Sequence, residues 1–171
     1  MARERTRLLV EIAVMAGLAV VLNFFRVFRM PQGGSVSLEM IPIFYLAMRR
    51  GGVVGMIGGG IYGMVQLLTD PYIVHPAQFI LDYPLAYLLV GLAGFFAARP
   101  ALGVAIGCLG RYLAHVVSGA IFFGMYTPDG WNIWGYSAVY NLTYMIPEGI
   151  IAFLVLRLLL GRSQGRGKLF G

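Results

Sequence analysis

Three carboxylates lie within strongly apolar stretches of a chain that has only seven acidic residues. They are Glu39, Asp82 and Glu148, and each stands in a run that a lipid bilayer would accommodate. An ionisable side chain at membrane depth is costly, and it normally faces the interior of a helix bundle or a cavity. These acids are therefore the first candidates for a functional site.

Further polar side chains recur three or four residues apart, which places them on single helical faces. The first stripe comprises Arg111, His115, Ser118, Gly119 and Phe122, and the second comprises Ser137, Asn141, Tyr144 and Glu148. In lipid such stripes must turn inward. From their depths along the two helices we expect Arg111 and Glu148 to form an ion pair, with a direct ligand role as the alternative.

Asp82 has no obvious cationic partner at its expected depth. Several aromatic residues are expected around it, namely Tyr72, Tyr83, Phe123, Trp131, Trp134 and Tyr136. A carboxylate among aromatic faces suits an aromatic or cationic ligand. An interfacial aromatic belt explains Trp131 and Trp134 equally well, but it does not explain Asp82, His115 and Asn141.

Composition identifies an integral membrane protein. Of the 171 residues, 59% are hydrophobic and 12% are charged, which is too few charges to coat a soluble domain. The net charge of +6 does not indicate nucleic acid, because the arginines stand in the gaps between apolar runs. Cys108 cannot form an intrachain disulfide, and no spacing indicates a metal or another cofactor.

Six apolar segments predict an all-α, six-helix membrane bundle formed by a single domain over residues 1–171. The expected spans are residues 8–28, 38–48, 53–69, 77–98, 102–126 and 136–160. The second is too short to cross a hydrocarbon core of about 30 Å as a straight helix, so it should be tilted, irregular or re-entrant.

The basic residues predict that both termini are cytoplasmic. With an even number of crossings, nine basic residues fall inside and Arg26 and Arg29 fall outside. The inner set is Arg3, Arg5, Arg7, Arg49, Arg50, Arg99, Arg162, Arg166 and Lys168. The loops at 69–76 and 127–135 then face outward.

Two stripes of small residues allow close helix approach. Gly51, Gly55, Gly59 and Gly63 repeat every fourth position, and we assign them to packing within the bundle. Ala13 and Gly17 form a smooth face on the first helix. That face is a candidate docking surface for another membrane subunit, with ordinary packing as the alternative.

An enzymatic reading rests on His115 and Ser118, which lie one turn apart. No nucleophile motif surrounds the serine and no oxyanion donors can be placed, so we expect no catalytic residues and no enzyme activity.

Longer motifs resemble the thiamine-specific substrate-binding (S) component of energy-coupling factor (ECF) transporters. They are residues 32–38 (QGGSVSL), 72–79 (YIVHPAQF) and 81–86 (LDYPLA), Arg111-Tyr112 with His115 and Ser118-Gly119, and Tyr136-Ser137 with Tyr140-Asn141. The resemblance implies a six-helix subunit of a prokaryotic plasma membrane. Such a subunit captures thiamine from outside and associates with a transmembrane coupling subunit and two ATPase subunits.

The resemblance also implies ligand-binding roles for particular residues. It carries the family's carboxylate–tyrosine pair onto Asp82 and Tyr83, its histidine and glycine onto His115 and Gly119, and its tyrosine and asparagine onto Tyr136 and Asn141. Phe123 stands where some relatives have a stacking tryptophan, while a tryptophan of the first outer loop has no match here. Tyr72 joins this set, and Glu39 is either a ligand or a residue of the pocket mouth. The family's small-residue docking pattern falls on Ala13 and Gly17, with glycine in place of the second alanine.

The chemistry of the residues agrees with thiamine, which combines a permanently charged thiazolium ring with a hydrogen-bonding aminopyrimidine. An S component for another vitamin such as riboflavin is the nearest alternative, although a neutral vitamin has less need of Asp82. The alternative from another class is a stand-alone channel or secondary transporter, for which a polar relay across the whole membrane is expected.

Overall fold

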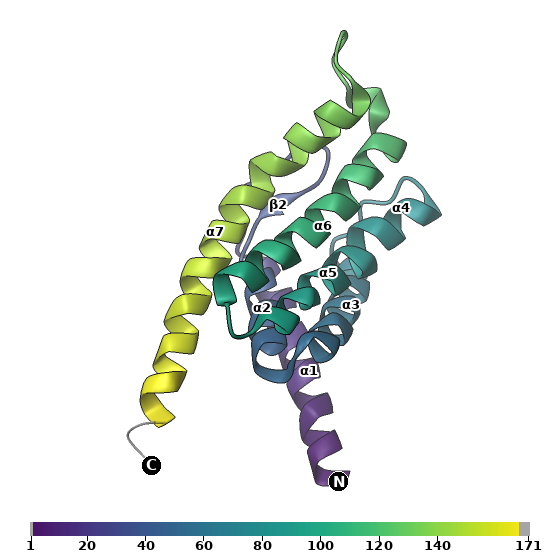
Figure 1. The fold of residues 1–171 in the computed structure, drawn as a ribbon. Helices are drawn as coiled ribbons and strands as arrows, with labels where there is room; N and C mark the ends of the chain where they lie inside the picture. Colours follow the sequence, from purple (N-terminus) through teal and green to yellow (C-terminus); the bar gives the residue numbers. More distant parts are fainter. Residues whose placement is uncertain (1, 168–171) are drawn as a thin grey trace.

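The computed structural model describes residues 2–167, with side chains described as far as Gly161. It is a helical bundle with one short antiparallel hairpin (Figure 1). The elements are α1 (Ala2–Asn23), β1 (Phe28–Arg29), β2 (Ser35–Val36), α2 (Met40–Arg50), α3 (Gly52–Thr69), α4 (Pro76–Ile80), the π-helical turn η1 (Leu81–Leu85), α5 (Ala86–Val90), the 3-10 segment η2 (Gly91–Phe96), α6 (Pro100–Phe122), the 3-10 turn η3 (Gly124–Tyr126) and α7 (Ile133–Gly167).

Five helical rods are long and apolar enough to cross a membrane. They are Ala2–Asn23, Gly52–Thr69, Pro76–Phe96, Pro100–Phe122 and Ile133–Gly161. The sixth helix, α2, has 11 residues and is buried along most of its length. The predicted six-helix membrane bundle is confirmed, and the short helix lies inside it, with its body buried against neighbouring helices and Arg49 and Arg50 exposed at its C-terminal end.

The first helix ends earlier than expected. Its predicted span reached residue 28, but α1 stops at Asn23, whose carbonyl accepts a hydrogen bond of 2.9 Å from Arg26 Nε. The chain then forms the hairpin, with Phe28 opposite Val36 and Arg29 opposite Ser35. Gly33 and Gly34 make its turn with φ of +88° and +83°, a conformation that glycine adopts without a steric penalty.

The other helix boundaries also differ from the prediction. The fifth predicted span ended at residue 126, but α6 ends at Phe122 and a 3-10 turn follows. The sixth was expected to end near residue 160, but α7 continues to Gly167. Hydrophobicity marks where lipid can surround a helix, whereas backbone hydrogen bonds decide where the helix ends.

A π-helical turn interrupts the rod that carries Asp82. Pro84 lies inside this turn and has no N–H to donate, which breaks the regular hydrogen-bond ladder. Such turns re-aim side chains and recur at functional sites. Here the turn contains both Asp82 and Tyr83.

Glycines of α3 bring this rod close. A Cβ at Gly63 would lie 2.5 Å from the carbonyl oxygen of Tyr83, and one at Gly59 would overlap the carbonyl of Tyr87. Packing within the bundle is therefore confirmed for these positions and for Gly55. Gly51 is an exception, because it lies in the turn between α2 and α3 with φ of +92° and has open space around it.

Both ends of the described chain lie at the same end of the bundle, and the connection from α6 to α7 lies at the other (Figure 1). The hairpin follows the C-terminal end of α1, and the connection from α3 to α4 follows the C-terminal end of α3. Both therefore lie at the end of the bundle opposite the termini. These three connections surround the cavity described next.

Candidate functional site

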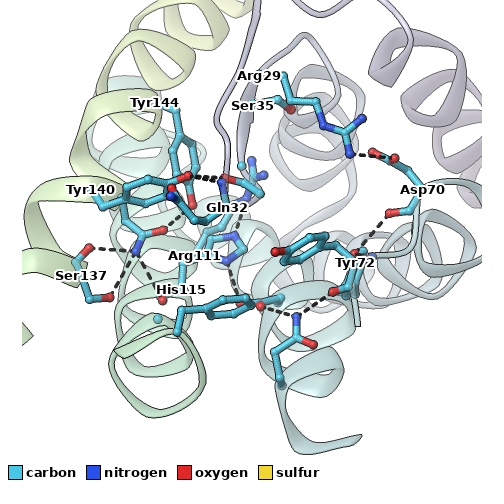
Figure 2. A pocket seen from close by; sticks show the side chains of 18 of the residues that line it. Arg29, Gln32, Ser35, Asp70, Tyr72, Arg111, His115, Ser137, Tyr140 and Tyr144 are labelled. Atoms are coloured by element: carbon cyan, nitrogen blue, oxygen red, sulfur yellow. Dashed lines mark hydrogen bonds and ion pairs between the residues drawn. The ribbon is translucent and has the colours of Figure 1, made fainter. Parts of the chain in front are cut away.

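One cavity brings together all nine residues that the sequence placed at a binding site. They are Glu39, Tyr72, Asp82, Tyr83, His115, Gly119, Phe123, Tyr136 and Asn141. Side chains reach it from α6, α7, the hairpin and the connection from α3 to α4 (Figure 2).

Asp82 is held by neutral hydrogen-bond donors. Gln78 Nε2 donates to Asp82 Oδ2 over 2.6 Å and Ser118 Oγ donates over 2.8 Å. His115 Nδ1 lies 3.0 Å from Asp82 Oδ1. These contacts fix the carboxylate at the cavity wall, with 16% of its side chain exposed.

The hydrogen bonds around His115 identify its tautomer. Arg111 Nε, which always carries a proton, donates to His115 Nε2 over 3.3 Å. Nε2 is therefore the acceptor, so Nδ1 carries the proton and donates to Asp82. This leaves Asp82 without a full positive charge beside it, as the sequence predicted, while His115 connects Asp82 to Arg111 through hydrogen bonds.

Arg111 lies at the centre of a buried network beneath the cavity. Its Nη1 lies 3.0 Å from Glu148 Oε2, so the predicted ion pair is confirmed. Its Nη2 lies 3.1 Å from Glu39 Oε1 and donates to the Tyr87 hydroxyl over 2.8 Å. The guanidinium also lies over the Tyr87 ring, 4.5 Å from its centroid.

Glu39 lines the cavity from a buried position, so of its two expected roles, ligand or residue of the pocket mouth, the second does not fit. Its side chain is 1% exposed. Tyr62 donates to Oε2 over 2.8 Å and Gln66 Nε2 over 3.1 Å, while Tyr87 donates to Oε1. A carboxylate with this many partners is already satisfied by the protein.

The deep cavity has an excess of acidic groups. Among the described residues of this inner part, the Arg111 guanidinium pairs with both Glu39, which lines the cavity, and Glu148, which lies behind it, while Asp82 has no ion pair with an arginine. Ser37 Oγ donates to Glu148 Oε1 over 3.2 Å, which adds a hydrogen bond to the Arg111–Glu148 ion pair. In a low-dielectric interior this imbalance favours a cation in the space above.

Gly119 allows α6 and α7 to meet at the cavity wall. A Cβ there would overlap Ser137 Oγ and lie 3.4 Å from Asn141 Nδ2. Asn141 is itself fixed, because Nδ2 donates to the Ser137 carbonyl over 2.8 Å and Oδ1 accepts from the Tyr144 hydroxyl.

Aromatic rings form the upper wall. Tyr72 and Phe123 stack with centroids 5.8 Å apart and an interplanar angle of 18°. The Tyr83 hydroxyl accepts from Tyr72 N over 2.7 Å and donates to the Asp70 carbonyl over 3.2 Å, which holds the connection from α3 to α4 in place. Trp131 and Trp134 do not line the cavity and are 55% and 53% exposed, so their placement around Asp82 is wrong and the aromatic-belt alternative describes them better.

The hairpin closes the cavity mouth through bonds that the sequence did not indicate. Tyr140 on α7 accepts from Gln32 N and donates to the Gly33 carbonyl, each over 3.0 Å. On the other side Arg29 Nη2 lies 3.3 Å from Asp70 Oδ1 (Figure 2). Arg26 also pairs with Asp70.

Sequence reasoning missed several cavity residues. They are Arg26, Arg29, Asp70, Gln78 and Tyr126. The two arginines served only as topology signals. Gln78 could have been found, because it stands one helical turn before Asp82.

Residues 9–166 of the chain match the sequence family described as "Thiamine transporter protein (Thia_YuaJ)". The chain is 43% identical over 170 residues to the thiamine transporter ThiT of Bacillus subtilis (strain 168), covering 88% of each protein. It is 30% identical over 172 residues to ThiT of Lacticaseibacillus paracasei, covering 89% of this chain and 86% of that protein.

Solved structures show the same architecture. ThiT from Listeria monocytogenes superposes with a TM-score of 0.87 at 28% identity, covering 95% of this chain and 97% of that one. The S component of a bacterial ECF transporter superposes with a TM-score of 0.66 at 18% identity, covering 96% and 99%, and this likeness concerns the fold. Bacterial relatives named as transporters and the five apolar spans identify a multi-pass plasma-membrane protein that is not an enzyme. The chain belongs to the thiamine transporter protein family.

Proposed function

We propose that this chain is the thiamine-binding S component of an ECF-type importer. It captures thiamine at the outer face and delivers it through a separate transmembrane coupling subunit, driven by two ATPase subunits. The observation that carries this proposal is Asp82, a carboxylate with neutral donors only, at an aromatic wall above an excess of acidic groups. The names of the relatives support the choice of vitamin.

Each half of thiamine finds suitable groups in the cavity. Asp82 offsets the charge of the thiazolium ring, and the stacked faces of Tyr72 and Phe123 add cation–π and stacking contacts. Tyr136, Asn141 and His115 supply hydrogen-bonding groups for the aminopyrimidine. A neutral vitamin such as riboflavin would leave the Asp82 carboxylate without a countercharge.

The proposed orientation places both termini in the cytoplasm and the cavity mouth outside. Arg49, Arg50 and Arg99 lie in the turns at the terminal end of the bundle, whereas Arg26 and Arg29 lie beside the mouth. The excess of basic residues at the terminal end follows the positive-inside rule.

Helix α1 is proposed to dock on the coupling subunit through Ala13 and Gly17. Both are exposed, and no atom lies within 4 Å of a Cβ built on Gly17. Ala16 and Ala19, on an adjacent face of the helix, are buried against the bundle. The exposed face is therefore free for close contact with another helix.

Titration calorimetry tests the proposal. Chain purified from cells grown without thiamine is titrated with thiamine and with riboflavin, in the absence of other subunits and of ATP. Calorimetry is preferable to tryptophan fluorescence because both tryptophans lie outside the cavity. We expect one thiamine to bind per chain with little heat from riboflavin, and binding of riboflavin alone would reject the vitamin assignment.

Uptake separates an S component from a stand-alone transporter. Vesicles that contain only this chain should bind thiamine without accumulating it, and co-reconstitution with a coupling subunit and ATPases should restore ATP-dependent uptake. Accumulation by the chain alone would favour the stand-alone alternative.

A further inference from the structure

A second concave surface lies outside the candidate site, between α6 and α7 in the half of the bundle nearer the termini. It is an open groove with a volume of about 480 Å³ and is almost entirely apolar. Ala101, Ala105 and Gly149 keep it open, while Leu109, Ile146 and Ile150 contribute half-exposed walls. At its floor the helices approach closely, since a Cβ on Gly149 would lie 3.1 Å from Cys108 Sγ.

The length of this groove matches one leaflet of a bilayer. On α6 it runs from Ala101 to Tyr112, which is roughly 17 Å at about 1.5 Å per residue. The hydrocarbon core of a membrane is about 30 Å thick, so a leaflet is about half of that. The groove therefore accommodates an acyl chain that enters from the membrane surface at the terminal end.

Two arginines stand where such a chain would emerge. Arg157 follows Phe153 by one turn on the same stripe of α7, and Arg99 directly precedes α6. Neither side chain has an ion-pair or hydrogen-bond partner among residues 2–161. The exposed backbone N–H groups at the start of α6 add to the positive potential there.

The acidic side chains of the protein lie elsewhere. Glu4 and Glu11 are on α1, Asp70 and Asp129 are at the outer end, and Glu39, Asp82 and Glu148 belong to the candidate site. Glu11 pairs with Arg50 and Arg7. Within residues 2–161, Arg99 and Arg157 thus present positive charge without an acidic partner at the membrane surface.

We propose that the groove binds an anionic phospholipid of the cytoplasmic leaflet, with one acyl chain between α6 and α7 and the phosphate at Arg99 and Arg157. Basic sites between transmembrane helices on the cytoplasmic side attract anionic head groups in this way. The bound lipid covers the α6–α7 seam in the half of the membrane opposite the vitamin cavity.

Native mass spectrometry tests this proposal with phosphatidylglycerol and phosphatidylcholine as probes. Detergent-purified chain is offered equal amounts of the two lipids, and we expect a preference of at least about tenfold for phosphatidylglycerol. The double variant Arg99→Gln/Arg157→Gln should abolish the preference. Arg3→Gln/Arg5→Gln, which removes the same charge from the same end of the molecule, should retain it.

A second pair of variants tests the acyl chain. Ala105→Trp fills the groove and should lower the occupancy of both lipids, whereas Leu113→Trp, on an exposed face of α6 outside the groove, should not. Melting temperatures equal to that of the parent establish that the variants are folded. If one of them does not fold, Arg157→Gln alone, at an exposed position, is compared with Arg5→Gln.

Several results would overturn the proposal. They are equal binding of the two lipids by the parent, equal losses in the two arginine variants, or unchanged lipid occupancy in Ala105→Trp. If Ala105→Trp keeps its lipid but prevents assembly with a coupling subunit, the groove is a protein contact instead.

Discussion

At the residue scale, Asp82 and Glu39 are both cavity carboxylates, but their surroundings give them different tasks. Asp82 accepts hydrogen bonds from Gln78, Ser118 and His115 and remains partly exposed to the cavity. Glu39 is buried and is satisfied by Arg111 together with two tyrosines and a glutamine. The first is suited to a ligand and the second to holding the bundle together.

We therefore expect Asp82→Asn to weaken thiamine binding more than Glu39→Gln does. Loss of a charged acceptor costs about 1.5 to 3 kcal/mol, which is roughly a ten- to 150-fold change in affinity. Glu39→Gln should instead lower the melting temperature of the empty protein, because it leaves polar partners unsatisfied in the interior. Calorimetry and thermal unfolding separate the two effects. Asp129→Asn, in the exposed outer loop, is the matched control, and equal affinity of Asp82→Asn and the parent would remove Asp82 from the site.

The ring of Phe123 gives a second prediction at this scale. Phe123→Trp should preserve or tighten thiamine binding and Phe123→Ala should weaken it, with a span of more than about 1 kcal/mol if the contact is desolvated. Phe122→Ala serves as the control, because that neighbouring ring stacks on His75 outside the cavity. The measurement is the thiamine affinity of each variant, corrected for the fraction of protein that is folded. An unchanged affinity in Phe123→Ala would exclude the stacking role.

Residue identities could be predicted where a polar group interrupts an apolar helical face. That signal found Asp82, His115, Asn141 and the Arg111–Glu148 pair. It could not assign Glu39, because its partners Tyr62 and Tyr87 come from two other rods and their registers depend on tertiary packing. The contact of Arg29 with Asp70 crosses two loops, and loop conformation leaves no periodic pattern in the sequence.

At the element scale, the close approach of α6 and α7 depends on Gly119. Gly119→Ala would drive a methyl group into Ser137 Oγ, so we expect lower stability and weaker binding. Adding Ser137→Ala should recover part of the loss, with a coupling energy of about 1 kcal/mol. Gly135→Ala, where the nearest atom is 3.9 Å from the new Cβ, should be close to neutral. Additive effects of the two substitutions in thermal unfolding would contradict this account.

Helix α1 carries the prediction for subunit contact. Ala13→Trp or Gly17→Trp should abolish transport by the assembled importer and leave thiamine binding by the solitary chain nearly intact, because both positions are exposed. Ala16→Trp, in a buried position, should destabilise the chain itself. If Gly17→Trp loses binding and transport together, the face belongs to internal packing.

Helices could be predicted where the length of an apolar segment is enough to identify them. The six helical segments, the short α2 among them, follow from hydropathy, but the hairpin does not. Residues 24–28 are mostly apolar and were assigned to the first span, while the turn at Gly33 and Gly34 and the anchor at Tyr140 fold them back over the cavity. The π-helical turn at Pro84 was also not foreseen, because a proline alone does not specify which irregular turn replaces the α-helix.

At the scale of the whole molecule, the basic residues are concentrated at the terminal end, while most of the carboxylates lie in or near the cavity and the outer end. Glu39, Asp70 and Asp82 line the cavity together with Arg26, Arg29 and Arg111, whereas Arg49, Arg50, Arg99 and Arg157 lie toward the terminal end. We propose that the basic residues set the orientation of the protein in the membrane and that the cavity carboxylates set its preference for a cationic ligand. Cysteine accessibility checks it. A cysteine at Arg5 in a Cys108→Ser background should react with an impermeant thiol reagent only after the cells are opened, whereas one at Asp129 should react in intact cells. The reverse pattern would invert the proposed topology.

The central claim is that the cavity recognises the positive charge of its ligand. The most direct measurement compares thiamine with an uncharged analogue, in which carbon replaces the thiazolium nitrogen, by calorimetric titration of the parent and of Asp82→Asn. We predict that the parent prefers thiamine by about tenfold or more and that this preference shrinks markedly in Asp82→Asn, with the difference forming a double-mutant cycle between carboxylate and cation. Equal affinity of the parent for the charged and the uncharged ligand would contradict the account.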